Sequence, residues 1–227
     1  MDDLSGKSVC VIGLGASGRA AVELLLAKGV KVTAVDSAES AALMEFATVM
    51  RERGVECHLG HNRVLPDAFD LAVVSPGVPL DQPQIASLQR RGIPVWGELE
   101  LGWRESGCLA IGITGTNGKT TTTELVSTML TQNQRRTVAA GNIGTPLSAV
   151  AGQTRELDVV TLEVSSFQLE TIASFRPNLA VLLNLAPDHL DRHGSMENYI
   201  RAKARLFENQ KPFDRAIIQW DAWQELQ

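Results

Sequence analysis

Cysteine is scarce in this sequence. The three cysteines, Cys10, Cys57 and Cys108, lie far apart, form no Cys-x-x-Cys pair and make an odd count. We therefore expect neither a disulfide framework nor a cysteine zinc site, and this usage fits a reducing compartment such as the cytoplasm. Cys10 and Cys108 lie in apolar, strand-like runs, where we expect them to pack in the core.

Long apolar runs are missing as well. No stretch reaches the roughly 20 apolar residues that a membrane-spanning helix needs, and the acidic first residues, Met-Asp-Asp, are unlike the start of a secretory signal. We expect no membrane partner and a cytoplasmic location.

Positive charge is not in excess either. The formal net charge is −5 and the isoelectric point is about 5.4, which argues against nucleic acid as the main partner.

The sequence does contain a regular alternation of short apolar runs and helical patterns. This order predicts an α/β fold with parallel sheets, and the pattern restarts near residues 97–107. We predict two parallel-sheet domains, a Rossmann-like domain over 1–97 and a P-loop ATPase-type central domain over 98–227, joined by a helix over 98–105. The expected strands cover residues 9–12, 30–35, 71–74, 93–96, 108–113, 159–164, 179–183 and 216–219, and the expected helices cover residues 20–27, 41–53, 84–91, 124–130 and 196–207.

Residues 112–123 read Gly-Ile-Thr-Gly-Thr-Asn-Gly-Lys-Thr-Thr-Thr-Thr, between an apolar run and a helical run. A strand, a glycine-rich turn and a helix N-terminus direct backbone N–H groups and a positive dipole end at one point, which suits a phosphate. Lys119 adds a mobile positive charge for the β- and γ-phosphates, and Thr120 adds a hydroxyl for Mg²⁺. Ile113 stands where the strict P-loop pattern has glycine, so the motif is a variant. The alternative is a Gly/Thr turn with a surface lysine.

A second glycine motif, Gly-Leu-Gly-Ala-Ser-Gly at 13–18, follows the first predicted strand, and Asp36 ends the second. This is the dinucleotide fingerprint, with an acidic residue placed for a ribose hydroxyl. Taken alone it predicts an NAD-dependent oxidoreductase. A UDP-linked compound would fit the same turn, and glycines that serve only close packing are a third possibility.

Polar side chains follow two further predicted strands. Glu163 ends a buried strand in the sheet that carries the P-loop, where a carboxylate is well placed to bind Mg²⁺, although an acid near a helix N-cap is the alternative. The loop over 184–194 contains two histidines, two aspartates and an arginine. Asp188 and His189 are its best candidates for a site, whereas His193 is more typical of a structural or exposed residue.

Two more residues complete the candidate site. Asn142 lies on a glycine-flanked turn and could orient a phosphate or a carboxylate, or could belong to a plain turn. Lys203, in a helical run, is typical of a solvated lysine.

Neither an oxidoreductase nor a simple ATPase needs two phosphate-binding turns. An enzyme that spends ATP on a nucleotide-linked substrate needs both, and we favour it over a non-catalytic nucleotide- or UDP-sugar-binding module.

Taken together, these segments resemble the Mur ligase family over nearly the whole chain, to about residue 210. The matching segments are GLGASG at 13–18, SPGVP at 75–79, GITGTNGKTTT at 112–122, GNIGTPL at 141–147, LEVSSFQLE at 162–170 and NLAPDHLDRHGSMENYIRAK at 184–203. Sister ligases share GTNGKTT, whereas EVSSFQLE together with GNIG and the short glycine-motif domain favours the member that adds D-glutamate to UDP-N-acetylmuramoyl-L-alanine. The glycine motif argues against the related folate-type ligases.

The resemblance implies an ATP-dependent amide ligase of peptidoglycan precursor synthesis, and so a part in cell-wall growth and division. In that reaction a substrate carboxylate attacks the γ-phosphate of ATP, and the amine of D-glutamate then attacks the acyl phosphate. The chain is about half as long as the three-domain members. We therefore expect the C-terminal domain, and the D-glutamate site with it, to be absent, and the 227 residues alone to be unable to complete ligation. A monomer is expected.

The family's residue roles can be placed on the matching positions. The UDP part would be bound by Gly15, Ala16, Ser17, Asp36, Ser37, Ser75, Pro76 and Gly77, and the sugar-peptide end by Asn142, Gln168 and His189. ATP would be bound by Gly115, Thr116, Asn117, Gly118, Lys119, Thr120 and Thr121. One Mg²⁺ would be held by Thr120 and Glu163 and a second by His189, while Lys203 matches a lysine that relatives carry as a carbamate and that bridges metal. Catalysis would rest on Lys119, Asn142, His189 and Lys203.

Overall fold

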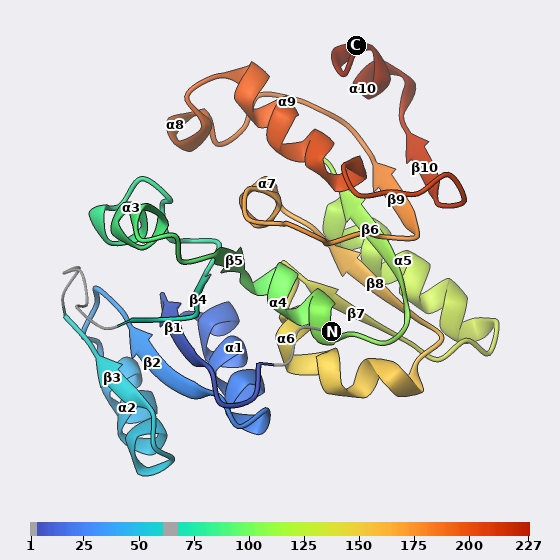
Figure 1. Cartoon of the computed structure of the whole chain (residues 1–227). Coiled ribbons are helices and arrows are strands. Elements are labelled where there is room, and N and C mark those ends of the chain that lie inside the picture. The colour runs from blue at the N-terminus through green and yellow to red at the C-terminus, as the bar shows by residue number, and fades with distance from the viewer. Residues whose placement is uncertain (1–3, 61–67) are drawn as a thin grey trace.

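The structure is a computed structural model that describes residues 4–60 and 68–227. It contains two parallel sheets of five strands each, placed side by side (Figure 1). The predicted α/β fold with two parallel sheets is confirmed, and the domain boundary between residues 97 and 98 stays a prediction. Among the helices of the described residues, none is long and apolar enough to cross a membrane.

The first sheet has the strand order β3-β2-β1-β4-β5. Its strands are β1 (Ser8–Ile12), β2 (Lys31–Val35), β3 (Glu56–His58), β4 (Leu71–Val74) and β5 (Val95–Gly97), and its helices are α1 (Ala16–Ala27), α2 (Ala41–Glu52) and α3 (Pro83–Arg90). The central strands are apolar almost throughout because helices cover both faces of the sheet. Strand β1 pairs with β2 on one side and β4 on the other. Ligands of such sheets bind at the carboxyl ends of the strands, where the strand order reverses.

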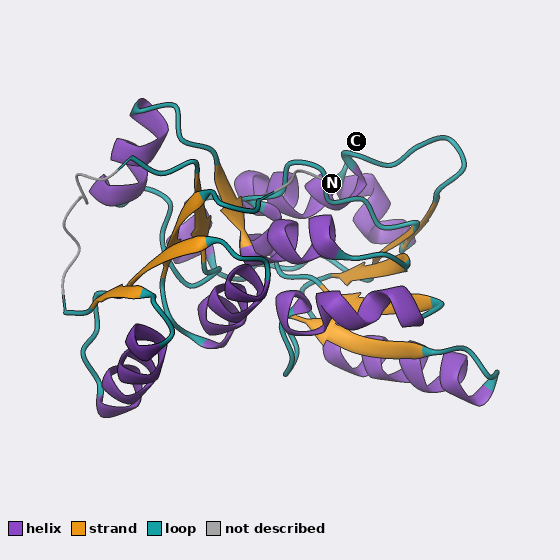
Figure 2. Cartoon of the chain, turned by 60° about the horizontal axis from the view of Figure 1, so that its bottom comes forward, coloured by secondary structure: helices purple, strands orange, loops and turns teal. Residues whose placement is uncertain are grey.

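The second sheet has the order β10-β9-β6-β8-β7, with β6 at its centre. Its strands are β6 (Leu109–Thr114), β7 (Thr137–Gly141), β8 (Val159–Glu163), β9 (Leu179–Leu182) and β10 (Arg215–Ile218). Its helices are α5 (Lys119–Gln132), α6 (Leu147–Val150), α7 (Ser166–Leu169), α8 (Leu190–His193), α9 (Met196–Ala204) and α10 (Trp220–Glu225), with 3₁₀ turns at Ala151–Glu156 and Arg205–Phe207. Helices lie along both sides of this sheet (Figure 2).

The sequence prediction placed two helix starts too late and missed two strands. Helix α1 begins at Ala16 and α5 at Lys119, directly after the glycine turns, whereas the helical pattern predicted starts at 20 and 124. Serine, glycine and threonine in the first turns are weak helix formers, so the pattern hides the true starts. Strand β3 is three residues long with polar ends, and β7 is only half-buried along most of its length, so neither shows a clear apolar run.

Helix α4 (Glu98–Glu105) joins the two sheets and lies between them in Figure 1. Leu101 is buried in the core around β1 and α1, whereas Leu99 is buried in the core around β8 and α6. At its end, Glu105 forms an ion pair with Lys28, which follows α1. The helix therefore contributes side chains to both cores.

Glu100 of α4 is fully buried and accepts several hydrogen bonds. The backbone N–H groups of Ala173 and Phe175 each donate to Oε2 at 2.9 Å, and Ser174 donates through its N–H and, at 2.6 Å, through its hydroxyl. Arg104, one turn along, donates from Nε at 2.6 Å. Burial alone would raise the pKa of Glu100, but these donors outweigh it and hold the pKa below its usual value. The carboxylate thus fixes the loop 173–175 to the linking helix.

The pKa of Glu98, on the same helix, is shifted in the opposite direction. Glu98 is fully buried, and its Oε1 accepts the N–H of Ser148 at 2.6 Å, while its Oε2 has no hydrogen-bond partner. Burial raises the pKa of Glu98 to about 7. In the folded chain this carboxyl therefore keeps a proton that the unfolded chain releases above its usual pKa near 4.5.

This shift predicts a pH-dependent stability. The contribution of Glu98 is complete below pH 4.5 and is lost as the pH rises through about 7. We expect the free energy of unfolding of the wild type to fall by about 1–3 kcal/mol between pH 5 and pH 8, relative to Glu98→Gln, which stays neutral throughout. Urea denaturation of both proteins at several pH values measures the difference. Parallel stability curves for the two proteins would contradict the assignment.

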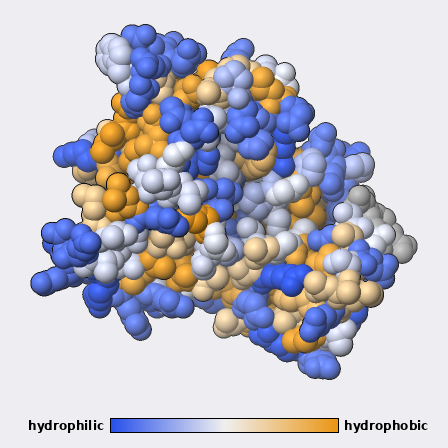
Figure 3. Space-filling model, turned by 180° about the vertical axis from the view of Figure 1, so that it is seen from behind, coloured by the Kyte–Doolittle hydropathy of each residue, from blue (hydrophilic) through white to orange (hydrophobic). Residues whose placement is uncertain are grey.

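Apolar side chains are exposed on parts of the second sheet. Apolar patches lie among hydrophilic ones on the left side of Figure 3, which is the side of the second sheet seen from behind. Within the described residues, the exposed large apolar side chains of this sheet and its helices are Leu109, Leu125, Met129, Leu190, Phe213, Ile217, Trp220 and Trp223. Four of these, Phe213, Ile217, Trp220 and Trp223, lie on β10 and α10 or directly before them.

Candidate functional site

The first glycine motif forms the turn between β1 and α1. An added Cβ on Gly18 would collide with the carbonyl oxygen of Gly13, and one on Gly13 would collide with Val78. Packing therefore explains these two glycines. It does not explain Gly15, which caps α1 and would place a Cβ in open space. Gly15 thus leaves the helix N-terminus open to a ligand.

A cavity of about 430 Å³ lies in front of this turn. It is lined by Ile12, Gly13, Gly15, Ala16, Ser17, Val35, Asp36, Ser37, Ser75, Pro76, Gly77, Val78, Gln82, Gln84 and Asn142. All the residues expected to bind the UDP part are in this set. Asn142 is included as well, although it follows β7 of the second sheet. The cavity therefore reaches the second sheet, whose Asn142 forms part of its wall.

Asp36 already has backbone partners. Its Oδ2 accepts the N–H of Leu14 at 2.6 Å, and its Oδ1 accepts the N–H of Ala38 at 2.8 Å. A carboxylate oxygen can accept a second hydrogen bond, so a ligand can still reach Asp36. The side chain also has a structural role that the sequence pattern does not reveal, because it holds the glycine turn against the end of β2.

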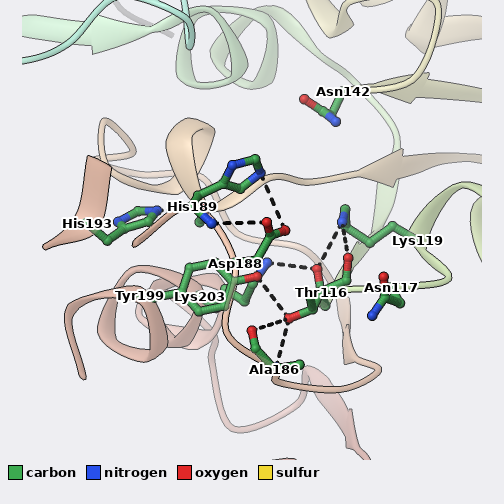
Figure 4. Close-up of polar contacts among 12 residues, drawn as sticks. Thr116, Asn117, Lys119, Asn142, Ala186, Asp188, His189, His193, Tyr199 and Lys203 are labelled. Atoms are coloured by element: carbon green, nitrogen blue, oxygen red, sulfur yellow. Dashed lines mark hydrogen bonds and ion pairs between the residues drawn. The ribbon is translucent and has the colours of Figure 1, made fainter. Parts of the chain in front are cut away.

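The second glycine motif forms the turn between β6 and α5. Ile113, the departure from the strict P-loop pattern, is buried inside β6, so the turn itself starts at Gly115. Gly118 has a φ of +82° and caps α5, a conformation that favours glycine. The side chain of Lys119 folds back over the turn, and its Nζ donates to the carbonyl oxygens of Gly115 at 3.0 Å and Thr116 at 2.8 Å (Figure 4).

Asn184 supports this turn and was not predicted as a site residue. Its Oδ1 accepts the N–H groups of Thr116 and Asn117 at 3.1 and 2.8 Å, and its Nδ2 donates to the carbonyl of Asn117. The Thr116 hydroxyl lies 2.9 Å from the Tyr199 hydroxyl and also bonds the carbonyl of Ala186. The loop after β9 and helix α9 thus hold the P-loop from one side (Figure 4).

Glu163 lies at the carboxyl end of β8, as predicted, and joins two other predicted residues. Its Oε2 accepts the hydroxyl of Thr120 at 2.6 Å, and its Oε1 accepts Nδ2 of Asn142 at 2.7 Å. A hydroxyl and a carboxylate at the edge of a glycine turn are hard oxygen ligands of the kind that Mg²⁺ prefers. These two groups therefore fit a magnesium ion. The described residues hold no cluster of three or more histidine, cysteine, aspartate or glutamate side chains with metal-site geometry.

Asn142 connects the two turns. It lines the first cavity and at the same time donates to Glu163, which bonds Thr120 of the P-loop. Lys119 is not among the residues that line the first cavity. The contacts of this side chain therefore connect the two glycine turns.

His189 is at the edge of a second cavity, of about 750 Å³. That cavity is lined by Gly77, Pro79, Leu80, Asp81, Phe167, Glu170, His189, Asp191 and Arg192, so Gly77 lines both cavities. His189 has a φ of +50°, which costs backbone strain in a residue other than glycine. Its side chain is half-exposed and packs against the Phe167 ring, with Nε2 3.5 Å from Oδ2 of Asp188.

Lys203 is buried, which its position in a polar helix does not suggest. It is 2 % exposed, and its Nζ donates to the carbonyl of Gly115 at 2.8 Å. Burial lowers the pKa of the Lys203 amine to about 7, and the positive charge of Lys119 adds to this effect. The amine therefore lies beneath the P-loop with a large neutral fraction near pH 7.

Gln168 lies in neither cavity. It is buried in the first turn of α7. Its side-chain Oε1 accepts the backbone N–H of Ser165, and its backbone N–H donates to the Ser165 hydroxyl. Its Nε2 has no hydrogen-bond partner. The structure thus gives Gln168 a capping task, and its expected contact with substrate stays a prediction.

Arg192 was also not predicted as a site residue, and it links the two sheets. Its guanidinium donates to the carbonyls of Pro76 and Val78 at 2.9 and 3.2 Å and to Glu170 at 3.0 Å. Glu170 in turn lies 3.3 Å from Nδ1 of the buried His193. The loop that carries His189 is therefore fastened to the Ser-Pro-Gly turn that lines the first cavity.

Comparison with protein-family models shows which family shares these two sheets. Residues 7–97 match the family model described as the Mur ligase MurD-like N-terminal domain, and residues 113–225 match the Mur ligase middle domain. The chain belongs to the Mur ligase family. Each of the two matched segments contains one of the two glycine turns.

Relatives in the family are much longer. The chain is 47 % identical over 221 residues to a protein of Koribacter versatilis and 46 % identical over 221 residues to one of Anaeromyxobacter dehalogenans, both named UDP-N-acetylmuramoylalanine--D-glutamate ligase. The alignments cover 96 % and 95 % of this chain but 49 % and 46 % of those proteins. The chain spans about half the length of the curated relatives it matches.

Solved Mur ligases share the fold. The chain aligns with UDP-N-acetylmuramate:L-alanyl-gamma-D-glutamyl-meso-diaminopimelate ligase from Neisseria meningitides at a TM-score of 0.60 and 17 % identity, covering 98 % of this chain and 74 % of that one. It aligns with UDP-N-acetylmuramate-alanine ligase MurC from Thermotoga maritima at 0.56 and 21 % identity, covering 97 % and 51 %. At these identities the likeness concerns the fold alone.

Proposed function

We propose that this chain carries the nucleotide sites of an ATP-dependent amide ligase that adds D-glutamate to UDP-N-acetylmuramoyl-L-alanine in the cytoplasm. The observation that supports it most is the chain of contacts through Asn142, because one side chain lines the first cavity and also bonds Glu163 beside the P-loop. A nucleotide-linked substrate and a triphosphate could then meet near this residue. Names of relatives that are 40–47 % identical over nearly all of this chain agree with the proposal.

The first cavity would hold the UDP part of the substrate. Gly15, Ala16 and Ser17 would offer the N-terminus of α1 to the diphosphate, and Ser75 and Gly77 would close the other side. Asp36 and Ser37 would contact the uridine end. Asn142, Gln168 and His189 would then bind the sugar-peptide end, which carries the reacting carboxylate.

The P-loop would hold ATP. Residues 115–121 would surround the phosphates, and Lys119 would leave the carbonyls of Gly115 and Thr116 to bind the β- and γ-phosphates. Thr120 and Glu163 would hold Mg²⁺, which when bound neutralises phosphate charge, and His189 and Lys203 would serve a second ion. As a carbamate Lys203 would become an anion that can bridge metal.

The proposed reaction joins two anions, so its barrier is largely electrostatic. The substrate carboxylate attacks the γ-phosphorus, ADP leaves and an acyl phosphate forms. The amine of D-glutamate then attacks the acyl carbon, phosphate leaves and an amide remains. In the first step Lys119 and the N–H groups of the turn stabilise the charge on the transferred phosphoryl group.

Calorimetric titration tests the proposal. The chain is expected to bind UDP-N-acetylmuramoyl-L-alanine at one site and, with Mg²⁺, a non-hydrolysable ATP analogue at another, while NAD(H) does not compete for the first. A ¹³C spectrum in labelled bicarbonate would report a carbamate on Lys203. Binding of NAD(H) in the first cavity would instead support the oxidoreductase interpretation of the glycine motif, and binding of neither nucleotide would refute the proposal.

A further inference from the structure

Gln84 has an unusual position in the first cavity. It is the second residue of α3, is 2 % exposed, and lines the cavity together with the glycine turn. Its Nε2 has no hydrogen-bond partner. A buried amide without a partner costs stability, so a side chain of this kind is unfavourable unless a ligand supplies the missing acceptor.

The surroundings of Gln84 indicate what that acceptor is. The next residue, Ile85, packs with Ile12 and Val35 in one apolar cluster, and the last two also line the cavity. Gln84 therefore shares the lining of the cavity with these apolar residues and with Asp36, at the end of β2. The N-terminus of α1 already offers charge-complementary N–H groups to phosphates. A neutral donor beside an apolar wall suits a planar, neutral ring with carbonyl oxygens.

We propose that the Gln84 amide, whose Nε2 is buried in the free chain, turns into the cavity and donates a hydrogen bond to a carbonyl oxygen of the pyrimidine base of the bound nucleotide, and so helps to select that base. The inference rests on the proposed function, because it takes the first cavity to be the uridine nucleotide site. It adds a specificity-determining residue from α3, an element that neither glycine motif includes. A buried polar group that pairs only with the correct ligand discriminates against ligands that leave it unpaired.

The test compares Gln84→Met with the wild type and with Gln89→Met, the same change at an exposed position of α3. ¹⁵N-detected titrations with UDP, UMP and uridine follow the N–H signals of Gly15 and Ser17, which report on this cavity and can measure millimolar affinities. We expect Gln84→Met to weaken binding of all three ligands roughly tenfold and to raise the melting temperature of the free chain by about 2–4 °C. Gln89→Met is expected to change neither.

Opposite changes in affinity and stability distinguish this role from a structural one. Unchanged affinity in Gln84→Met, with or without a change in melting temperature, would overturn the proposal. A loss seen with UDP but absent with uridine would move the contact to a phosphate and overturn the base assignment. If UDP shifts neither Gly15 nor Ser17 in the wild type, the proposed uridine site itself fails, whatever the variant does.

Discussion

Glu100→Ala is expected to lower the free energy of unfolding by about 3–5 kcal/mol, the range found when one member of a buried ionic network is removed. The carboxylate is fully buried and receives hydrogen bonds from Arg104, Ala173, Ser174 and Phe175. Its removal leaves the buried N–H of Phe175 without this acceptor and takes the shared acceptor away from Arg104, Ala173 and Ser174. Glu100→Gln keeps the shape but loses the charge, and a smaller loss of about 2–3 kcal/mol is expected.

Urea denaturation at pH 7 measures both variants. Glu45→Ala is the matched control, since Glu45 is an exposed glutamate in the interior of α2, and it is expected to change stability by less than about 0.5 kcal/mol. The pKa of Glu100 lies below its usual value near 4.5, so the effect of the alanine change is expected to shrink as the pH falls below that value. Equal stability of Glu100→Ala and Glu45→Ala would show that loop 173–175 does not depend on this carboxylate.

Lys119→Ala is expected to weaken binding of the Mg²⁺–ATP analogue by about 2–3 kcal/mol, or roughly 30- to 150-fold. In the free chain the ammonium group is held over the P-loop by the carbonyls of Gly115 and Thr116. It can therefore move to phosphate oxygens, which are stronger acceptors. In the complete reaction the same change would remove a charge aimed at the transition state and cost on the order of 10²- to 10³-fold in turnover.

Calorimetry with the ATP analogue and with UDP-N-acetylmuramoyl-L-alanine provides an internal comparison. The variant is expected to keep its affinity for the UDP compound, because Lys119 does not line the first cavity. Lys211→Ala removes an exposed lysine and is expected to leave both affinities unchanged. If Lys119→Ala binds the analogue as well as the wild type does, the second glycine turn is not the triphosphate site.

Much of the fold and part of the site could be predicted from the sequence. The glycine turns and the position of Glu163 at a strand end follow from local pattern, because the carboxyl ends of parallel strands share one edge of the sheet. Their contacts follow from that geometry: Glu163 meets Thr120 as expected. Such predictions need only the order of strands and helices.

The rest of the site depends on contacts between distant segments. Asn184 meets the P-loop across 67 residues, and Arg192 meets Pro76 across 116 residues. No local periodicity marks either of them. Lys203 is a lysine in a polar helix, so its burial beneath Gly115 follows only from how α9 packs on the sheet. Gln84 is hidden in the same way, since its neighbours in the sequence say nothing about the cavity that it lines.

The linking helix α4 has a consequence for how the molecule comes apart. Leu99 and Leu101 lie two residues apart on one rigid segment, yet each is buried in a different core. Melting of either core would expose part of this helix and loosen its hold on the other. We therefore expect the two halves to unfold as one cooperative unit, so that damage to the first sheet would be transmitted as lost protection in the second.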